Sequence, residues 1–373
     1  MVNEQRIVDE FIELVKVDSE TKNEKEISLV LKEKFTALGC DVQEDNAAST
    51  TEHEAGNLVI TLQGSKKDGP VLYFTSHMDT VVPGKGITPF IEEGYIKTDG
   101  TTILGADDKA GIAAILETIR QLKEQNMAHA DIQFIITVGE ESGLVGAKAL
   151  DTSLVKADYG YALDSDGDVG NIIVAAPTQA KIKAVIKGKT AHAGVAPEKG
   201  ISAITVASKA VSKMPLGRID EETTANIGRF EGGSQTNIVC DEVYILAEAR
   251  SLVREKLDKQ AAEMKKAFEE AAEEMGAEAE VEIDIMYPGY KLSEADTVVQ
   301  TAQHGIKKAG RTPELLTSGG GSDGNIISGY GIPTVNLAVG YEEIHTTNEK
   351  MPISELVKIT EVVLSIISHS VSE

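Results

Sequence analysis

Apolar residues at helical spacing open the chain. Four of them would lie on one face of a first helix: Ile7, Phe11, Leu14 and Val15. A second helix is expected to begin after Asn23, because Glu26 completes an Asn-x-x-Glu capping pattern. Its apolar residues also recur at helical spacing: Ile27, Leu31, Phe35 and Leu38. Both helices are therefore predicted to pack one apolar face against a core.

Short apolar runs then alternate with helical patterns. The predicted strands of this part are residues 57–62, 71–74, 132–138 and 159–163, and a helix is predicted over 110–123. Runs that are apolar throughout indicate strands that are covered on both faces. The alternation predicts an α/β fold with a mixed sheet flanked by helices.

The pattern changes near Pro177, where polar and apolar residues alternate as in a strand with one buried face. Strands are predicted over 179–187, 224–230, 242–249 and 279–286, and helices over 201–214 and around Met264, Phe268, Ala271 and Met275. This β-α-β-β-α-β order predicts an inserted, ferredoxin-like α+β domain over residues 178–288. A helix over 295–309 and a strand over 334–339 would return the chain to the first domain, residues 1–177 and 289–373.

Composition narrows the class of protein. The chain is 41% hydrophobic and 26% charged, which is ordinary for a globular protein with a proper core. Its formal net charge of −24 disfavours nucleic acids and anionic membranes as partners. Two distant cysteines, Cys40 and Cys240, fit a reducing compartment. Since there is no signal-peptide pattern and no long apolar span, we expect a cytoplasmic location.

Residues with metal-binding chemistry follow the predicted strands. The motif Ser76-His77-Met78-Asp79-Thr80 comes just after the apolar run 71–74, and the end of such a strand is where ligands usually bind in α/β sheets. His77 could bind a metal ion while Asp79 fixes the orientation of its ring. Taken alone, the pair is more often a hydrogen-bonded histidine near a strand end.

Two acidic motifs come next. Asp107, in Gly105-Ala106-Asp107-Asp108-Lys109, precedes a predicted helix, where an aspartate is usually a cap, but paired acids among small residues also suit a carboxylate that bridges two cations. Glu140 and Glu141 follow the predicted strand 132–138. Neighbouring carboxylates are costly in a dry cleft unless cations compensate them. One glutamate could therefore bind a metal while the other acts as a general base, although a solvated turn is the simpler alternative.

Asp164, after the predicted strand 159–163, and His345, late in the chain, complete the set. Neither is informative by itself. Together, two histidines and several carboxylates at successive strand ends suit a pair of zinc ions about 3.5–4 Å apart in a hydrolase. The absence of cysteine from the set argues against a purely structural zinc site.

The order of these motifs resembles that of the co-catalytic zinc peptidases. This family includes peptidase T, a glutamate-releasing bacterial carboxypeptidase, acetylornithine deacetylase and aminoacylase. The resemblance covers nearly the whole chain, including the inserted domain. Residues 104–107 and 320–324, Leu-Gly-Ala-Asp and Gly-Gly-Ser-Asp-Gly, are most similar to peptidase T and its relatives.

The resemblance implies two Zn²⁺ ions per chain, with Co²⁺ or Mn²⁺ as alternatives. The implied ligands are His77 and Asp164 for one ion, Glu141 and His345 for the other, and Asp107 for both. Glu140 would be the general base, and Asp79 would orient His77. The family also has a cis peptide bond after its bridging aspartate, which would be the Asp107–Asp108 bond here.

The resemblance identifies the inserted domain as a lid and dimerisation domain. His192, in Thr190-Ala191-His192-Ala193-Gly194, would help to stabilise the oxyanion, in dimers often from the partner subunit. Asn237 and Arg250 would bind the substrate, Arg250 through a carboxylate. By residue type alone, these three would be a loop histidine, a turn asparagine and a salt-bridged surface arginine.

One position departs from peptidase T. That enzyme carries an arginine four residues before the aspartate of its Gly-Gly-Thr-Asp-Gly segment, and Gly319 stands at the equivalent place here. A missing guanidinium removes a bidentate partner for a carboxylate, so tripeptide selectivity stays open. The same glycine-rich segment lacks the Gly-Lys-Ser/Thr ending and follows no predicted strand, which argues against a phosphate loop.

These observations predict zinc-dependent hydrolysis of amide bonds in small peptides, with removal of the N-terminal residue from a tripeptide-sized substrate. A deacylase that acts on N-acyl amino acids has the same metal core and stays open as an alternative. A binding protein that has kept the fold is disfavoured because no ligand is lost and Glu140 is present. A homodimer formed through the lid domain also stays open.

Overall fold

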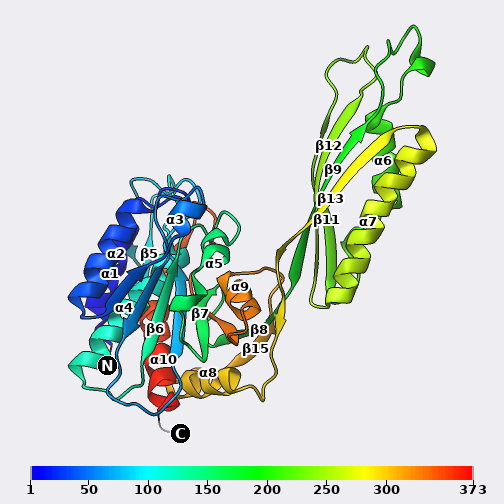
Figure 1. Ribbon diagram of the computed structural model, residues 1–373. Coiled ribbons are helices and arrows are strands. Elements are labelled where there is room, and N and C mark those ends of the chain that lie inside the picture. Colours follow the sequence, from blue (N-terminus) through cyan, green and yellow to red (C-terminus); the bar gives the residue numbers. More distant parts are fainter. Residues whose placement is uncertain (1, 372–373) are drawn as a thin grey trace. The chain divides into compact units, whose positions relative to one another are not determined.

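The computed structural model describes residues 2–371, which form two compact units (Figure 1). Unit 1 contains the chain up to Ala175, Leu292–Ser318 and the residues from Ser322 onward. Unit 2 contains Ala176–Lys291 together with Gly319–Gly321. Most of unit 2 is therefore a single long insertion into the chain of unit 1.

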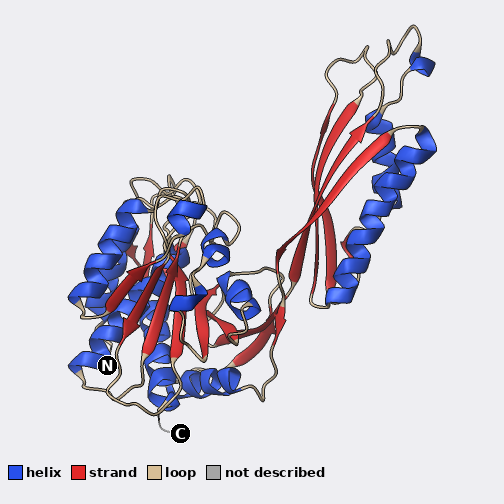
Figure 2. Cartoon of the chain, in the orientation of Figure 1, coloured by secondary structure: helices blue, strands red, loops and turns tan. Residues whose placement is uncertain are grey.

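Unit 1 is built on a mixed sheet whose strands are drawn in red in Figure 2. Along this sheet the strands follow the order β1-β2-β6-β3-β7-β16-β8, and β15 also pairs with β8. Its strands are β1 (Asp41–Glu44), β2 (Leu58–Leu62), β3 (Leu72–His77), β6 (Ile132–Thr137), β7 (Tyr159–Ser165), β8 (Asn171–Ala176), β15 (Glu314–Thr317) and β16 (Thr334–Ala338). The central strands β6, β3, β7 and β16 are parallel to one another, whereas β2 pairs antiparallel with β6, and β8 pairs antiparallel with β16. A small second sheet consists of β4 (Phe90–Glu92), β5 (Tyr95–Lys97) and β17 (Lys350–Pro352).

Helices cover both faces of the main sheet. They are α1 (Glu4–Val15), α2 (Lys25–Ala37), α3 (Ala47–Thr50), α4 (Ala106–Glu124), α5 (Val145–Ala149), α8 (Thr297–Lys308), α9 (Asp323–Gly329) and α10 (Ile353–Ser370). Side chains alternate between the faces, so Leu72 and Phe74 join the main core with α1, α4 and α10, while Tyr73 and Ile135 pack with Ile327 of α9. The predicted α/β fold with a mixed sheet flanked by helices is confirmed.

The start of the second helix differs from the prediction. The structure begins α2 at Lys25, after Glu24, and finds no side-chain cap, so the capping box of Asn23 and Glu26 is wrong. The Asn23 amide instead donates to the carbonyl of Thr21. The carboxylate of Glu24 turns into the protein, where it is fully buried, and does not cap its own helix.

Unit 2 is a five-stranded antiparallel sheet with two helices packed against it. The elements are β9 (Thr178–Lys187), α6 (Ala203–Lys213), β10 (Gly217–Arg218), β11 (Thr223–Gly232), β12 (Glu242–Ser251), α7 (Arg254–Met275) and β13 (Glu278–Tyr287), in the sheet order β10-β11-β12-β9-β13. The predicted β-α-β-β-α-β order is present, with the two-residue strand β10 in addition. A short turn at Pro197–Lys199 and β14 (Tyr290–Lys291) complete the unit.

The glycine-rich segment lies between two regular elements of unit 1 that the sequence did not predict. Strand β15 ends at Thr317, so the statement that this segment follows no strand was wrong. The segment leads into α9, whose first residue is Asp323. Asp323 is buried at that helix start, and its acidic side chain disfavours a phosphate there, which argues further against a phosphate loop.

None of the helices described between residues 2 and 371 is both long enough and apolar enough to cross a bilayer.

Candidate metal centre and active site

The carboxyl ends of the central parallel strands gather the predicted ligands. His77 is the last residue of β3, Asp164 lies near the end of β7, and Glu141 follows β6. Strands β6, β3, β7 and β16 are neighbours, so the segments that follow them meet at one edge of the sheet. Asp107 enters from the start of α4, and His345 from the loop after β16.

Asp107 lies between the two histidines. Its Oδ1 is 3.0 Å from Nε2 of His77, and its Oδ2 is 3.2 Å from Nε2 of His345. One carboxylate thus presents one oxygen to each imidazole. This is the arrangement expected of a group that bridges two cations.

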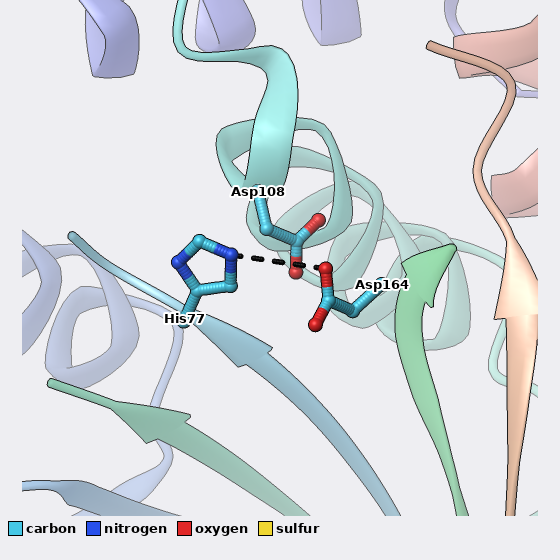
Figure 3. Close-up of side chains that lie close together, drawn as sticks. All are labelled: His77, Asp108 and Asp164. Carbon is cyan, nitrogen blue, oxygen red and sulfur yellow. Dashed lines mark ion pairs between the residues drawn. The ribbon is translucent and has the colours of Figure 1, made fainter. Parts of the chain in front are cut away.

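Each histidine also faces a second carboxylate. Nε2 of His77 is 3.7 Å from Oδ1 of Asp164, and the ring and the carboxylate point toward one another (Figure 3). Nε2 of His345 is 2.9 Å from Oε1 of Glu141. Two half-sites follow, one with His77 and Asp164 and one with His345 and Glu141, and Asp107 contributes to both.

Asp79 connects His77 with the segment that follows β6. Nδ1 of His77 lies 3.0 Å from the backbone carbonyl of Asp79 and 3.4 Å from its Oδ1. The same carboxylate accepts hydrogen bonds from the backbone N–H groups of Glu140, at 3.0 Å, and Glu141, at 3.2 Å. Asp79 therefore orients the imidazole and also holds the two glutamates in place.

Crowded negative charge perturbs the acids of this cluster. Burial raises the pKa of Glu140 well above its usual range, and nearby Asp323 and Glu141 raise it further. Burial also raises the pKa of Asp164, with Asp107 and Glu140 adding to it. When ionised, these carboxylates are therefore not fully compensated by the side chains around them.

The pKa values of the two histidines are raised as well. Hydrogen bonds from its ring to the carboxylates of Asp107 and Glu141 raise the pKa of His345 to about 10. Burial acts to lower the pKa of His77, but the hydrogen bonds of Asp107 and Asp79 raise it well above its ordinary value. Where no metal ion is bound, both imidazoles therefore bind a proton more tightly than a free histidine does. Metal binding must displace those protons, so metal affinity should fall as the pH is lowered.

The donor set fits divalent metal ions. Side-chain atoms of His77, Asp107 and Glu141 lie within 4.8 Å of one another, as do those of His77, Asp108 and Asp164. Nitrogen and carboxylate oxygen donors without sulfur suit a catalytic zinc site and also accept Co²⁺ or Mn²⁺. Cations bound here would neutralise the carboxylates that the side chains leave uncompensated.

Comparison with known proteins agrees with the family resemblance of the sequence motifs. The sequence profile of peptidase family M20/M25/M40 matches residues 73–369. The chain belongs to this family. The M20 chain is 31% identical to peptidase T of Clostridium perfringens, over 97% of this chain and 98% of that protein.

Two solved structures are much more similar to this M20 chain. Aminopeptidase PepT from Bacillus cereus is 65% identical, with a TM-score of 0.95 and 99% of each chain covered. A tripeptidase from Staphylococcus aureus is 53% identical, with a TM-score of 0.98 and all of both chains covered. The resemblance to the co-catalytic peptidases, and to peptidase T within them, is confirmed. The family and the clustered ligands make the chain a metallopeptidase.

The bond between Asp107 and Asp108 is cis, as the resemblance implied. Asp108 was not predicted as a site residue, although it lies close to His77 and Asp164. Its oxygens are already engaged: the Ser76 hydroxyl donates to Oδ2, and the N–H of Gly111 donates to Oδ1 at 3.2 Å. Asp107 is thus the better placed of the two acids to bind metals in this M20 peptidase.

Glu349 is a further residue that the sequence did not single out. Its carboxylate is 2% exposed and accepts three backbone hydrogen bonds, from Leu104 at 2.7 Å, Gly105 at 2.8 Å and Asp107 at 3.0 Å. Glu349 follows His345 by four residues, so it joins the loop of one ligand to the loop of another. In the sequence, the position of Glu349 shortly after the candidate ligand His345 was the only feature that could have pointed to this role.

Lys109 is a buried cation beneath the cluster. Its Nζ donates to Oγ of Ser19 at 2.7 Å and to the carbonyl of Met78 at 2.8 Å. Burial lowers the pKa of Lys109 to about 8, although Asp79 and Asp108 act to raise it. A single lysine does not balance this many carboxylates, which again favours bound cations.

Asp323 allows the effect of burial on the pKa of an acid near this cluster to be tested. The Thr137 hydroxyl donates to its Oδ2, and no described group hydrogen-bonds its Oδ1. Burial raises the pKa of Asp323 to about 6 from 3.8. The folded chain therefore holds this proton more tightly than the unfolded chain, and the contribution of Asp323 to stability falls as the pH rises from about 4 to 6.

Asp323→Asn is expected to gain stability relative to the natural chain as the pH rises, since asparagine cannot ionise. With about 1.4 kcal/mol per pKa unit, the gain should be about 2 kcal/mol between pH 4.5 and pH 7.5. Denaturant unfolding of both metal-free proteins at the two pH values measures it. A difference in unfolding free energy that does not change with pH would contradict the raised pKa.

The predicted lid residues all lie in unit 2. The exposed His192 and Asn237 stand on paired segments, since the N–H of Ala193 donates to the carbonyl of Asn237 at 3.0 Å. Arg250 on β12 binds Glu248 through Nε, at 2.9 Å, and donates through Nη1 to the carbonyl of Gly319 at 3.1 Å. The structure thus brings His192 close to Asn237, and Arg250 close to Gly319.

Proposed function

We propose that this chain is an aminopeptidase with two zinc ions that removes the N-terminal residue from tripeptide-sized substrates. The observation that carries the proposal is the position of Asp107, with one oxygen toward each of two half-sites. The likeness to an aminopeptidase of Bacillus cereus and a tripeptidase of Staphylococcus aureus supports the substrate class. Cobalt or manganese could replace zinc with the same donors.

The ligands would be His77 and Asp164 for one ion, His345 and Glu141 for the other, and Asp107 for both. Bound there, the ions would polarise the scissile carbonyl and make a water molecule acidic enough to react near neutral pH. Glu140 would accept the proton of the attacking water on its carboxylate and return it to the leaving amine. Asp79 would hold the backbone of Glu140 and the ring of His77 during both steps.

Substrate contacts are assigned to unit 2, which we propose to act as the lid. His192 would donate a hydrogen bond to the developing oxyanion, and Asn237 and Arg250 would bind the ends of the peptide. The guanidinium of Arg250 is already hydrogen-bonded to Glu248, so it would bind a substrate carboxylate and Glu248 at the same time. A homodimer through this unit and a cytoplasmic location stay predictions, the latter supported by two free cysteines.

Hydrolysis of a small panel tests the function. The chelated protein is assayed with and without added zinc on dipeptides, tripeptides, a longer peptide and N-acetyl amino acids. Zinc-restored release of the N-terminal residue, fastest from tripeptides, is the expected result. Release of acetate would move the chain to the deacylases, and a metal-bound protein without turnover on any of these amides would refute the proposal.

Gly319→Arg is expected to strengthen the preference for a free C-terminal carboxylate. A Cβ at Gly319 would meet no described atom within 4 Å, so a side chain can leave the backbone there without a clash. A new guanidinium pairing with the substrate carboxylate should raise the kcat/KM ratio of a free over an amidated tripeptide about tenfold. Gly319→Met is the control for size, and an equal ratio in both variants would contradict the expectation.

A further inference from the structure

A histidine outside the metal cluster supports the segment that carries the two glutamates. His53 is 5% exposed, and its Nδ1 lies 2.6 Å from Oε1 of Glu24. Its Nε2 lies 3.2 Å from Oγ of Ser142, directly after Glu141. The hydrogen-bonded chain Glu24–His53–Ser142, in which Glu24 and His53 are buried, thus ends on the Gly139–Ser142 turn, which contains Glu140 and Glu141.

The ring of His53 also contacts the start of this turn. Gly139 has a positive φ of +57°, and a Cβ there would lie 2.2 Å from Cε1 of the ring. The imidazole therefore fills the space beside Gly139 that a side chain at this position would need. The Ser142 hydroxyl is 3.1 Å from the Gly139 carbonyl, which closes the turn over the ring. His53 thus contacts both ends of the turn, and the two glutamates lie between them.

Glu24 fixes the orientation of this ring. It is completely buried, and its Oε1 also accepts the backbone N–H of Lys22 at 2.9 Å. Because Nδ1 faces a carboxylate, it carries a hydrogen, and Nε2 is directed at Ser142. Asp79 binds the backbone of Glu140 and Glu141 from a separate segment, so the turn is held by Asp79 and by His53.

We propose that His53, oriented by Glu24, is a positioning residue that sets the places of Glu140 and Glu141. The proposal rests on the proposed function, in which Glu140 is the base and Glu141 a metal ligand. Loss of the ring would remove its contacts at both ends of the turn and leave Asp79 as the side chain that binds the backbone of the turn from outside. Displacement of a base by about 1 Å can cost about 10²-fold in rate. Loss of a group that orients a ligand typically weakens metal binding about 10–100-fold.

The test compares His53→Ala with His129→Ala. His129 is also buried in unit 1, 7% exposed, and its ring is hydrogen-bonded only locally, 2.7 Å from the Ala130 carbonyl. At a temperature where both variants are folded, kcat and KM are measured on a tripeptide. Zinc affinity of the metal-free proteins is measured by competition with a chromophoric chelator. This second readout does not depend on which substrate the enzyme takes.

His53→Ala should lower kcat at least about tenfold with little change in KM, and should weaken zinc binding about 10–100-fold. His129→Ala should change kcat and zinc affinity by no more than about twofold, even if its Tm falls as much as that of His53→Ala. His53→Gln should recover part of both losses, since its amide reaches toward Ser142. If His53→Ala does not fold, Glu24→Gln is the alternative variant, since glutamine has about the volume of glutamate. It should show smaller losses of kcat and zinc affinity in the same direction.

Equal kcat and equal zinc affinity in the two alanine variants would overturn the proposal. So would a loss of activity in Ser142→Ala that His53→Ala does not share, because that would make Ser142 the important group. A natural chain that binds zinc but cleaves no peptide would refute the proposed function alone. The zinc affinities of His53→Ala and His129→Ala would still decide whether His53 positions Glu141.

Discussion

Glu140→Gln is expected to lower kcat on a tripeptide about 10²–10⁴-fold while the protein keeps its full metal content. Glutamine fills the same volume but cannot accept a proton. The group it replaces is partly buried near Glu141 and Asp323, and burial raises its pKa toward the range where a carboxylate is an effective base. The N–H of residue 140 still donates to Asp79, so the turn should keep its shape.

Steady-state kinetics and metal analysis of the purified variant check this prediction. Glu343→Gln is a suitable control, because Glu343 is exposed in the loop of His345 and its side chain forms no hydrogen bond with the described residues, while its backbone carbonyl accepts one from the Thr346 hydroxyl. That variant should keep kcat within about twofold. If Glu140→Gln stays active with both metals bound, another group must be the base. If it loses metal, the role of Glu140 includes holding the ions.

The metal cluster was predictable because its residues follow strands. A run of buried residues such as 132–137 is recognisable from its apolar composition, and parallel strands place whatever follows them at one edge. The residue types at these strand ends then indicated a metal site, because His77, Asp164 and the Glu140–Glu141 pair are unusual after such strands. The family resemblance added what strand patterns cannot give, above all that Asp107 lies between the two half-sites.

The supporting groups could not be predicted in this way. Glu349 binds the backbone of Leu104 and Gly105 across more than 200 residues of sequence, and a lone glutamate carries no sign of such a contact. Glu24 has the residue type of a helix start, yet its carboxylate turns inward to His53. The capping box failed at the same place, because local propensity was overridden by a buried tertiary contact.

Asp107→Asn is expected to remove both metal ions, whereas Asp164→Asn should remove only one. The reason is geometric: the two oxygens of Asp107 face His77 and His345, while Asp164 faces His77 alone. An asparagine keeps one oxygen and turns an N–H₂ group toward the other half-site, where it cannot bind a cation. Hydrolysis should fall to background in the Asp107 variant, and added zinc should not restore it.

Metal content after dialysis against low free zinc distinguishes these outcomes. The natural chain should hold two ions, Asp164→Asn one and Asp107→Asn none, with unfolding curves to confirm that each protein is folded. Asp108→Asn is the matched control, since the Asp108 carboxylate is engaged by Ser76 and Gly111 rather than by a histidine. It should keep both ions. An Asp107 variant with one tightly bound ion would mean that this carboxylate serves a single half-site, and the shared-ligand arrangement would have to be abandoned.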